Sequence, residues 1–261
     1  MASPKSTTGQ PITAGNAGIT PTIIPASPTT VILIPAFNEA DVIADVLGEI
    51  RAACDFPVIV IDDASTDNTV AIAERAGATV IPLPVQLGAW GATQTGLRYA
   101  LRNGYDTAIT MDADGQHEAA SLAALLEPIN TGVADVVVGA CTQRGSWLRH
   151  IAWKMMKQAS GIRLEDITSG FRVYNRMAIR QLAGWRATLL DYQDIGVLLL
   201  LQSKGLSIVD VKVPMQPRRN GKSRVFHSWV MVVYYMCLTL TLGLSKRKFA
   251  HRYRSPYLLV L

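Results

Sequence analysis

Short apolar runs alternate with amphipathic stretches along much of the chain. Residues 31–34 are apolar, mostly β-branched and closed by Pro35, which predicts a buried strand that ends in a loop. Residues 39–53 carry apolar side chains at helical spacing behind two acidic residues, which predicts an amphipathic helix. The alternation continues with strands expected at 57–61, 79–81, 108–111 and 135–139, and helices at 67–76, 91–102 and 119–129. This order indicates an α/β fold with a mostly parallel sheet flanked by helices.

Polar segments follow three of the predicted strands, at residues 35–39, 62–67 and 112–116. In parallel α/β sheets, ligands bind beyond the carboxyl ends of the strands, so these segments are where chemistry is expected. A basic, aromatic helical stretch at 146–158 follows the last predicted strand. We expect the region 160–224 to complete the site.

Two aspartates, Asp112 and Asp114, come directly after an apolar strand. Carboxylate oxygens at this position suit Mg²⁺ or Mn²⁺, with water and a diphosphate completing the coordination. The alternative interpretation is a pair of acids that solvates a loop. His117 and the other three histidines have no ligand spacing, which favours surface or packing roles for them.

A second acidic pair, Asp62 and Asp63, also ends a strand. A carboxylate can accept hydrogen bonds from a base N–H or from ribose hydroxyls, which makes Asp63 a candidate nucleotide contact. In the same segment, Ser65 or Thr66 could cap the next helix, and simple capping is the alternative role for Asp67.

Composition limits the class of protein and its compartment. The chain has 261 residues, 49% hydrophobic and 17% charged, which fits one catalytic-sized domain rather than a disordered chain. Three separated cysteines without a CxxC pair give no disulfide framework, so a reducing cytoplasm is the default. Residues 1–29 are rich in Ser, Thr, Pro, Gly and Ala and are expected to form a flexible leader.

Positive charge is concentrated at the C-terminal end. The formal net charge is +5, and residues 211–261 hold ten Lys or Arg and no acid. Within this region, residues 225–244 carry no formal charge and would span roughly 30 Å as a helix. Because basic residues flank the segment on both sides, we favour an interfacial helix at the cytoplasmic face of the cell membrane over a single span, with a buried core helix as a third option.

Taken in order, five segments resemble the signatures of family 2 glycosyltransferases of the GT-A fold, and most closely the dolichyl- and polyprenyl-phosphate sugar synthases. The segments are 34–39 (IPAFNE), 60–67 (VIDDASTD), 112–117 (DADGQH), 166–172 (DITSGFR) and 218–224 (RRNGKSR). The resemblance covers roughly residues 30–225. It implies a GT-A catalytic domain at 30–224, followed by a membrane-associated apolar helix and basic tail at 225–261.

The resemblance also implies roles for single residues. Nucleotide binding falls to Pro35, Ala36, Asn38, Glu39, Asp63 and Asp112. The metal and diphosphate fall to Asp112 and Asp114, with Gln116 as a further ligand. The phosphate of the lipid acceptor falls to Ser169, Arg172, Arg218, Arg219, Lys222 and Arg224. Asp114, Asp166 and Arg172 are the residues expected to act directly in catalysis.

The acceptor determines whether a base is needed. A lipid phosphate is already anionic near neutral pH, so it needs positioning by arginines more than deprotonation. If the acceptor were a sugar hydroxyl, a general base would be required, and Asp166, Asp191 and Asp194 are the candidates. Capping or surface solvation remains the alternative role for each.

One segment departs from the family pattern. Many relatives have Gly-Lys-Gly where this chain reads Leu87-Gly-Ala-Trp-Gly91, so no phosphate contact by a lysine is implied here. This departure is the main encouragement for an alternative in which the protein is a non-catalytic nucleotide-sugar-binding module.

The leading hypothesis is metal-dependent, inverting transfer of a sugar from a GDP- or UDP-sugar to a polyprenyl or dolichyl phosphate, with Mn²⁺ or Mg²⁺ as cofactor. A second enzymatic hypothesis is extension of a glycan hydroxyl during cell-surface polysaccharide synthesis. The expected partners are the donor, the acceptor and membrane lipid, with a homo-oligomer or a membrane-protein partner left open. Nucleic-acid binding is not expected, because the basic tail surrounds an apolar segment rather than a recognition helix.

Overall fold

The structure is a computed structural model that describes residues 29–141, 164–166, 169–190 and 195–216. Several predicted features lie outside these ranges: the leader up to residue 28, the helical stretch at 146–158, the basic loop at 218–224 and the apolar segment at 225–244. Among the helices of the described ranges, none combines the length and the hydropathy needed to cross a membrane.

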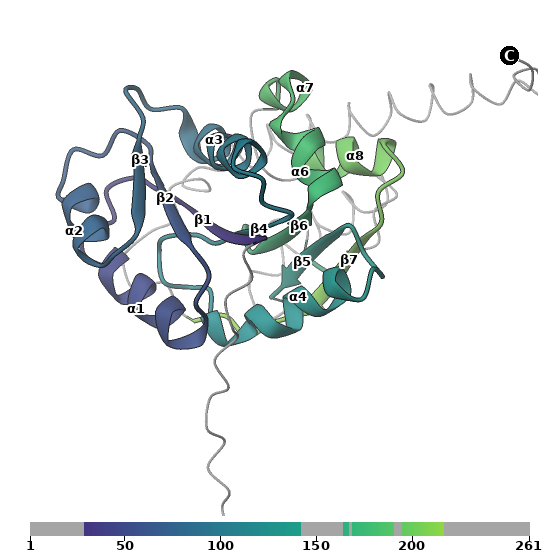
Figure 1. Cartoon of the computed structure of the whole chain (residues 1–261), viewed down its shortest axis with the longest axis horizontal. Coiled ribbons are helices and arrows are strands. Elements are labelled where there is room, and N and C mark those ends of the chain that lie inside the picture. Colours follow the sequence, from purple (N-terminus) through teal and green to yellow (C-terminus); the bar gives the residue numbers. More distant parts are fainter. Residues whose placement is uncertain (1–28, 142–163, 167–168, 191–194, 217–261) are drawn as a thin grey trace, which may run out of the picture.

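A seven-stranded sheet forms the centre of the molecule (Figure 1). Its strands are β1 (Thr30–Ala36), β2 (Val58–Asp62), β3 (Thr79–Pro82), β4 (Thr107–Thr110), β5 (Val136–Ala140), β6 (Arg172–Asn175) and β7 (Ile208–Lys212). Their order is β3-β2-β1-β4-β6-β5-β7. Only β6 runs antiparallel to its neighbours, β4 and β5, so the prediction of a mostly parallel sheet is confirmed.

Helices cover both faces of the sheet (Figure 1). One face carries α1 (Ile43–Ala53), α2 (Thr69–Arg75), the short η1 (Ala119–Ser121) and α4 (Leu122–Asn130). The other carries α3 (Gly88–Arg102), α6 (Arg176–Ala183), α7 (Trp185–Thr188) and α8 (Ile195–Ser203). Alternate residues of β1 enter the two cores, with Ile32 and Ile34 on the α1 side and Val31 and Leu33 on the α3 side. A strand buried on both faces explains the uninterrupted apolar run.

Two predicted boundaries differ from the structure. The first strand does not end before Pro35 but continues through it to Ala36. The β1–β4 ladder stops at Leu33, so the N–H that proline lacks is not needed for pairing with β4. Helix α1 begins at Ile43 rather than at residue 39, because Glu39 belongs to the preceding loop and donates its backbone N–H to Thr69 Oγ1.

Candidate active site

The predicted nucleotide and metal residues of the described ranges gather at one edge of the sheet. The carboxyl ends of β1, β2 and β4 lie at this edge, followed by the segments that contain Asn38, Asp63 and Asp112. Because β6 is antiparallel, its first residue, Arg172, lies at the same edge beside Thr110, the last residue of β4. The polar segments after β1, β2 and β4 therefore share one edge of the sheet.

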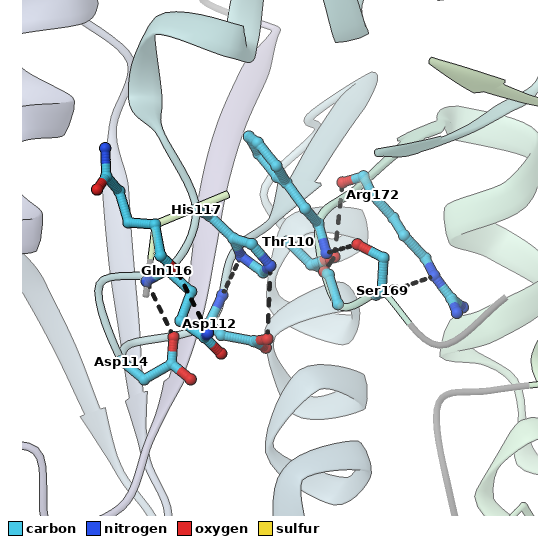
Figure 2. A network of polar contacts seen from close by, with 10 residues as sticks. Thr110, Asp112, Asp114, Gln116, His117, Ser169 and Arg172 are labelled. Atoms are coloured by element: carbon cyan, nitrogen blue, oxygen red, sulfur yellow. Dashed lines mark hydrogen bonds and ion pairs between the residues drawn. The ribbon is translucent and has the colours of Figure 1, made fainter. Parts of the chain in front are cut away.

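The segment after β4 presents two carboxylates in different surroundings. The Asp112 side chain is 41% exposed, whereas Asp114 is buried and accepts a hydrogen bond from the Gln116 backbone N–H at 3.1 Å (Figure 2). Strand β4 ends at Thr110, so both aspartates lie close to the end of the strand. One carboxylate is therefore open toward a ligand while the other is held by its loop.

Gly170 brings the segment before β6 against Asp112. The Thr110 hydroxyl donates to the Gly170 carbonyl at 2.8 Å, which fixes the glycine backbone beside the end of β4. A Cβ on Gly170 would lie 2.9 Å from Asp112 Cγ and would overlap with a carboxylate oxygen. The Asp112 carboxylate therefore occupies the space that any other residue at position 170 would fill.

His117 is a site residue that the sequence analysis missed. Its side chain is buried, which fits the packing role expected for it, but the ring also contacts Asp112. The Asp112 backbone N–H donates to His117 Nδ1 at 3.1 Å (Figure 2). The ring stacks on Phe171 with centroids 4.9 Å apart. The sequence signal was its place at the end of the segment 112–117, which does not reveal that the ring folds back.

Gln116 is positioned differently from the two aspartates. Its side chain points away from the Asp112 and Asp114 carboxylates (Figure 2), and its amide lies 3.4 Å from the Gln216 carbonyl, to which it donates. Its expected role as a metal ligand therefore stays a prediction, and it would require the side chain to turn toward the carboxylates.

The donor set suits a hard divalent cation. Asp112 and Asp114 supply carboxylate oxygens, the ligands that Mg²⁺ and Mn²⁺ prefer. Within the described part of the chain, no three His, Cys, Asp or Glu side chains gather as an ion site. Two carboxylates without a full protein cage fit an ion that shares its coordination with water and a diphosphate.

The loop after β1 is bonded to the loop after β2. Asn38, which has a φ of 51°, accepts the Thr66 backbone N–H at 2.8 Å and donates its own backbone N–H to Ser65 Oγ at 2.9 Å. The prediction that Ser65 or Thr66 caps the next helix is wrong, because Asn68 is the N-cap residue of α2 and the hydroxyls of Ser65 and Thr66 bond to Asn38. These bonds shape the backbone around Pro35, Ala36, Asn38 and Glu39, whose contacts with a nucleotide remain predictions.

Asp67 carries out the capping instead. It accepts hydrogen bonds from the backbone N–H and the hydroxyl of Thr69, the first residue of α2, and from the Ala40 N–H at 3.2 Å. Burial alone would raise the pKa of Asp67, but these hydrogen bonds outweigh it and lower the pKa below its usual value. Asp67 therefore joins the two loops as a carboxylate.

Asp63 is buried at the start of α3. Its two oxygens accept the backbone N–H groups of Leu87 at 2.7 Å and Gly88 at 2.9 Å. A carboxylate at a helix N-terminus is favoured by the helix dipole and satisfies N–H groups that lack partners within the helix. Asp63 thus has a clear structural role, and each oxygen keeps a lone pair for the base contact predicted for it.

Trp90 has a structural role that explains its departure from the family pattern. Its indole Nε1 donates to the Ala187 carbonyl at 2.8 Å, and the side chain is 4% exposed. Gln94, one turn further along α3, donates to the carbonyls of Leu182 and Gly184. The segment that encouraged the non-catalytic alternative is therefore accounted for by the packing of α7 on α3.

The residues expected to receive the acceptor phosphate are only partly within the described ranges. Arg172 is fully buried and its Nε donates to the Ser169 carbonyl at 2.8 Å. Asp166, the candidate base, is 1% exposed. The other members of these two sets, Arg218, Arg219, Lys222, Arg224, Asp191 and Asp194, lie outside the described residues, and the roles of both sets stay predictions.

Comparison with known proteins decides the family. The model of glycosyl transferase family 2 matches residues 31–183. The chain belongs to this family. The resemblance seen in the sequence is thereby confirmed, and the protein is a glycosyltransferase.

Two curated relatives and one solved structure illustrate the likeness. Polyprenol monophosphomannose synthase of Mycolicibacterium smegmatis is 27% identical over 80% of this chain and 85% of its own. Undecaprenyl-phosphate mannosyltransferase of Micrococcus luteus is 31% identical over 74% of this chain and 86% of its own. Glucosyl-3-phosphoglycerate synthase from Mycobacterium tuberculosis, crystallised with Mn²⁺, uridine diphosphate and phosphoglyceric acid, has a TM-score of 0.63 at 22% identity, covering 84% of this chain and 78% of its own. The last likeness shows that this family 2 glycosyltransferase shares the fold of that enzyme.

Proposed function

We propose that this glycosyltransferase moves a sugar from a GDP- or UDP-sugar to a polyprenyl phosphate. The observation that carries the proposal is a contact between the DAD segment (residues 112–114) and the SGFR segment (residues 169–172), in which Asp112 lies against Gly170. This contact places the residues that we assign to the donor diphosphate beside the segment that we assign to the acceptor phosphate. The names of the two relatives, which denote transfer of mannose to polyprenyl phosphates, support the acceptor class.

The donor side of the reaction falls to the loops after β1, β2 and β4. We assign the nucleotide base to Asp63 and the diphosphate to Asp112 and Asp114, whose carboxylates would hold Mn²⁺ or Mg²⁺. The metal supplies positive charge that stabilises the leaving nucleoside diphosphate. Asp112 and Asp114 place that charge at the end of β4. The hydrogen bonds of Asn38 and Asp67 join the two loops that we propose to contact the nucleotide.

The acceptor side falls to Ser169 and Arg172 at the start of β6, together with the basic loop 218–224. An anionic phosphate oxygen held in line with the anomeric carbon attacks from the face opposite the leaving diphosphate, and the configuration inverts. Because that oxygen is already ionised, no side chain has to remove a proton.

We further propose that the enzyme works at the cytoplasmic face of the membrane, held there by the segment 225–244. A surface on α6 and α7 supports this position. Trp185 and Leu189 are 70% and 73% exposed, Arg186 lies over the Trp185 ring, and residues 176–190 contain no acid. An apolar and cationic surface of this kind complements an anionic bilayer. The Trp90–Ala187 bond ties it to the start of α3, next to the nucleotide loops.

The proposal is tested by measuring nucleoside diphosphate release from a panel of GDP- and UDP-sugars, with Mn²⁺ or Mg²⁺, in the presence and absence of polyprenyl phosphate. We expect one donor to be turned over only when the lipid is present. Release that depends on a glycan and not on the lipid would favour the glycan hypothesis instead.

The membrane position is tested by sedimentation with vesicles that contain phosphatidylglycerol. The double variant Trp185→Ser/Leu189→Ser should sediment less than the unaltered protein, and equal sedimentation would contradict a membrane role for this surface.

A further inference from the structure

We propose that His117 is a positioning residue that holds the Asp112 carboxylate in the orientation needed for the metal and diphosphate. This inference rests on the proposed function, since it concerns the same metal site. Nothing in the spacing of the DAD segment requires a histidine there. The contacts of the His117 ring support this role.

The two ring nitrogens face two parts of the same residue. Nδ1 accepts the backbone N–H of Asp112 at 3.1 Å, so Nδ1 carries a lone pair and the proton of the neutral ring lies on Nε2. Nε2 is 3.6 Å from Asp112 Oδ2. It is buried and has no hydrogen-bond partner among the described residues, so the carboxylate is the acceptor that this N–H faces.

The ring itself cannot easily turn away. Its side chain is 2% exposed and stacks on Phe171 at an interplanar angle of 16°. The backbone of His117 forms an antiparallel bridge with Met215, and the Gln116 carbonyl accepts the Gln216 N–H at 2.9 Å. Packing and backbone pairing therefore fix the ring before any ligand arrives.

The two oxygens of Asp112 are confined from two directions. Oδ1 lies against Gly170, where a Cβ would overlap with it, and Oδ2 faces His117 Nε2. Phe171 links the two walls, because it follows Gly170 in sequence and carries the His117 ring on its face. A carboxylate that is 41% exposed is thus oriented without being buried, which leaves it available to a cation.

The test compares His117→Phe with His117→Asn. Phenylalanine keeps a ring that can stack on Phe171 but removes both nitrogens, whereas the asparagine amide can still accept the Asp112 N–H. Mn²⁺ affinity is measured by the paramagnetic resonance signal of free Mn²⁺ in the presence of GDP or UDP, with no sugar or lipid added. We expect His117→Phe to bind Mn²⁺ on the order of 10–100-fold more weakly. His117→Asn should lie between His117→Phe and the unaltered protein, because it keeps an acceptor for the Asp112 N–H but has no counterpart of Nε2. When the Mn²⁺ concentration is varied in activity assays, His117→Phe should have a higher KM for Mn²⁺ than the unaltered protein. Its kcat at saturating Mn²⁺ should be less affected.

Phe171→Leu is the matched control, because it removes the stacking partner and leaves the nitrogens in place. Unchanged Mn²⁺ affinity in a folded His117→Phe would overturn the inference, as would a loss in Phe171→Leu as large as that in His117→Phe. If His117→Phe does not fold, His117→Asn and His117→Leu are compared instead, and equal affinities in the two would overturn it. The binding experiment contains no acceptor, so a failure to transfer sugar to polyprenyl phosphate leaves its result intact.

Discussion

Gly170 leaves room for the carboxylate of Asp112, and this contact joins two segments that lie 58 positions apart in the sequence. The Gly170 backbone has no positive φ, so space rather than conformation is what requires glycine here. The Thr110 hydroxyl holds the Gly170 carbonyl at 2.8 Å, which prevents the backbone from retreating. The position of the metal-site carboxylate thus depends on a residue outside its own loop.

Gly170→Ala is expected to displace Asp112 while leaving the fold intact. A displacement of about 1 Å at a reacting centre can lower the rate by about 100-fold, and we expect a loss of that order in kcat/KM. Gly48→Ala is the control, because no atom lies within 4 Å of a Cβ at Gly48 in the middle of α1. Full activity in a stable Gly170→Ala protein would contradict the assigned role of Asp112.

Trp90→Phe should destabilise the protein through one hydrogen bond. The substitution leaves the buried Ala187 carbonyl without its indole donor, which costs about 1–3 kcal/mol of unfolding free energy. Chemical denaturation measures the change. The exposed Trp185→Phe serves as control and should change stability by less than about 0.5 kcal/mol. Equal stability of the two variants would show that the bond between α3 and α7 contributes nothing.

Asp63→Asn should weaken nucleotide binding. An amide NH₂ would face the Leu87 or Gly88 N–H in place of an oxygen, so the start of α3 and any base contact are both disturbed. A hydrogen bond to a charged group contributes about 1.5–3 kcal/mol, equivalent to roughly a 10–100-fold rise in Kd for the nucleoside diphosphate. Asp106→Asn, which alters only the Asp106–Arg176 ion pair, should bind normally. An unchanged Kd in Asp63→Asn would exclude this aspartate from the nucleotide site.

Acid should weaken the fold partly through Asp135. Burial would raise the pKa of this carboxyl, but hydrogen bonds from Ser207 and Asn175 outweigh it and lower the pKa. A lowered pKa in the folded state stabilises the protein above about pH 4, the unfolded value, and this stabilisation disappears as the pH falls through the folded value. Asp135→Asn should therefore lose less stability than the unaltered protein between about pH 5 and pH 3. Identical pH profiles, measured by thermal unfolding, would refute the contribution.

The sequence predicted the elements whose signal is local. Strands β1 to β5 and helices α1 to α4 were found because apolar periodicity is a property of neighbouring residues. Strand β6 was missed, because Arg172–Asn175 is short and mixed in polarity. Strand β7 was also missed, because no separate elements were predicted within residues 160–224. The order of strands in a sheet depends on tertiary packing, so the insertion of an antiparallel β6 between β4 and β5 had no local signal.

The same limit applies to the site. The three polar segments after β1, β2 and β4 were predicted from the rule for parallel sheets, and they do share one edge. The contact of Asp112 with Gly170 was not predicted, because it depends on β6 lying beside β4. The contact with His117 lies within one loop, but apolar periodicity does not reveal that the ring folds back. The structural role of Trp90 likewise depends on α7, nearly one hundred positions away, which periodicity cannot place.

The most direct test of the account is the identity of the product. The enzyme is incubated with Mn²⁺, polyprenyl phosphate and a donor that carries a radiolabelled sugar, and the label is then partitioned between organic solvent and water. The account predicts label in the lipid fraction, on a sugar linked through phosphate with inverted anomeric configuration, and no such product from Asp114→Ala. Label that appears only in a water-soluble glycan, or an equal lipid product from Asp114→Ala, would contradict it.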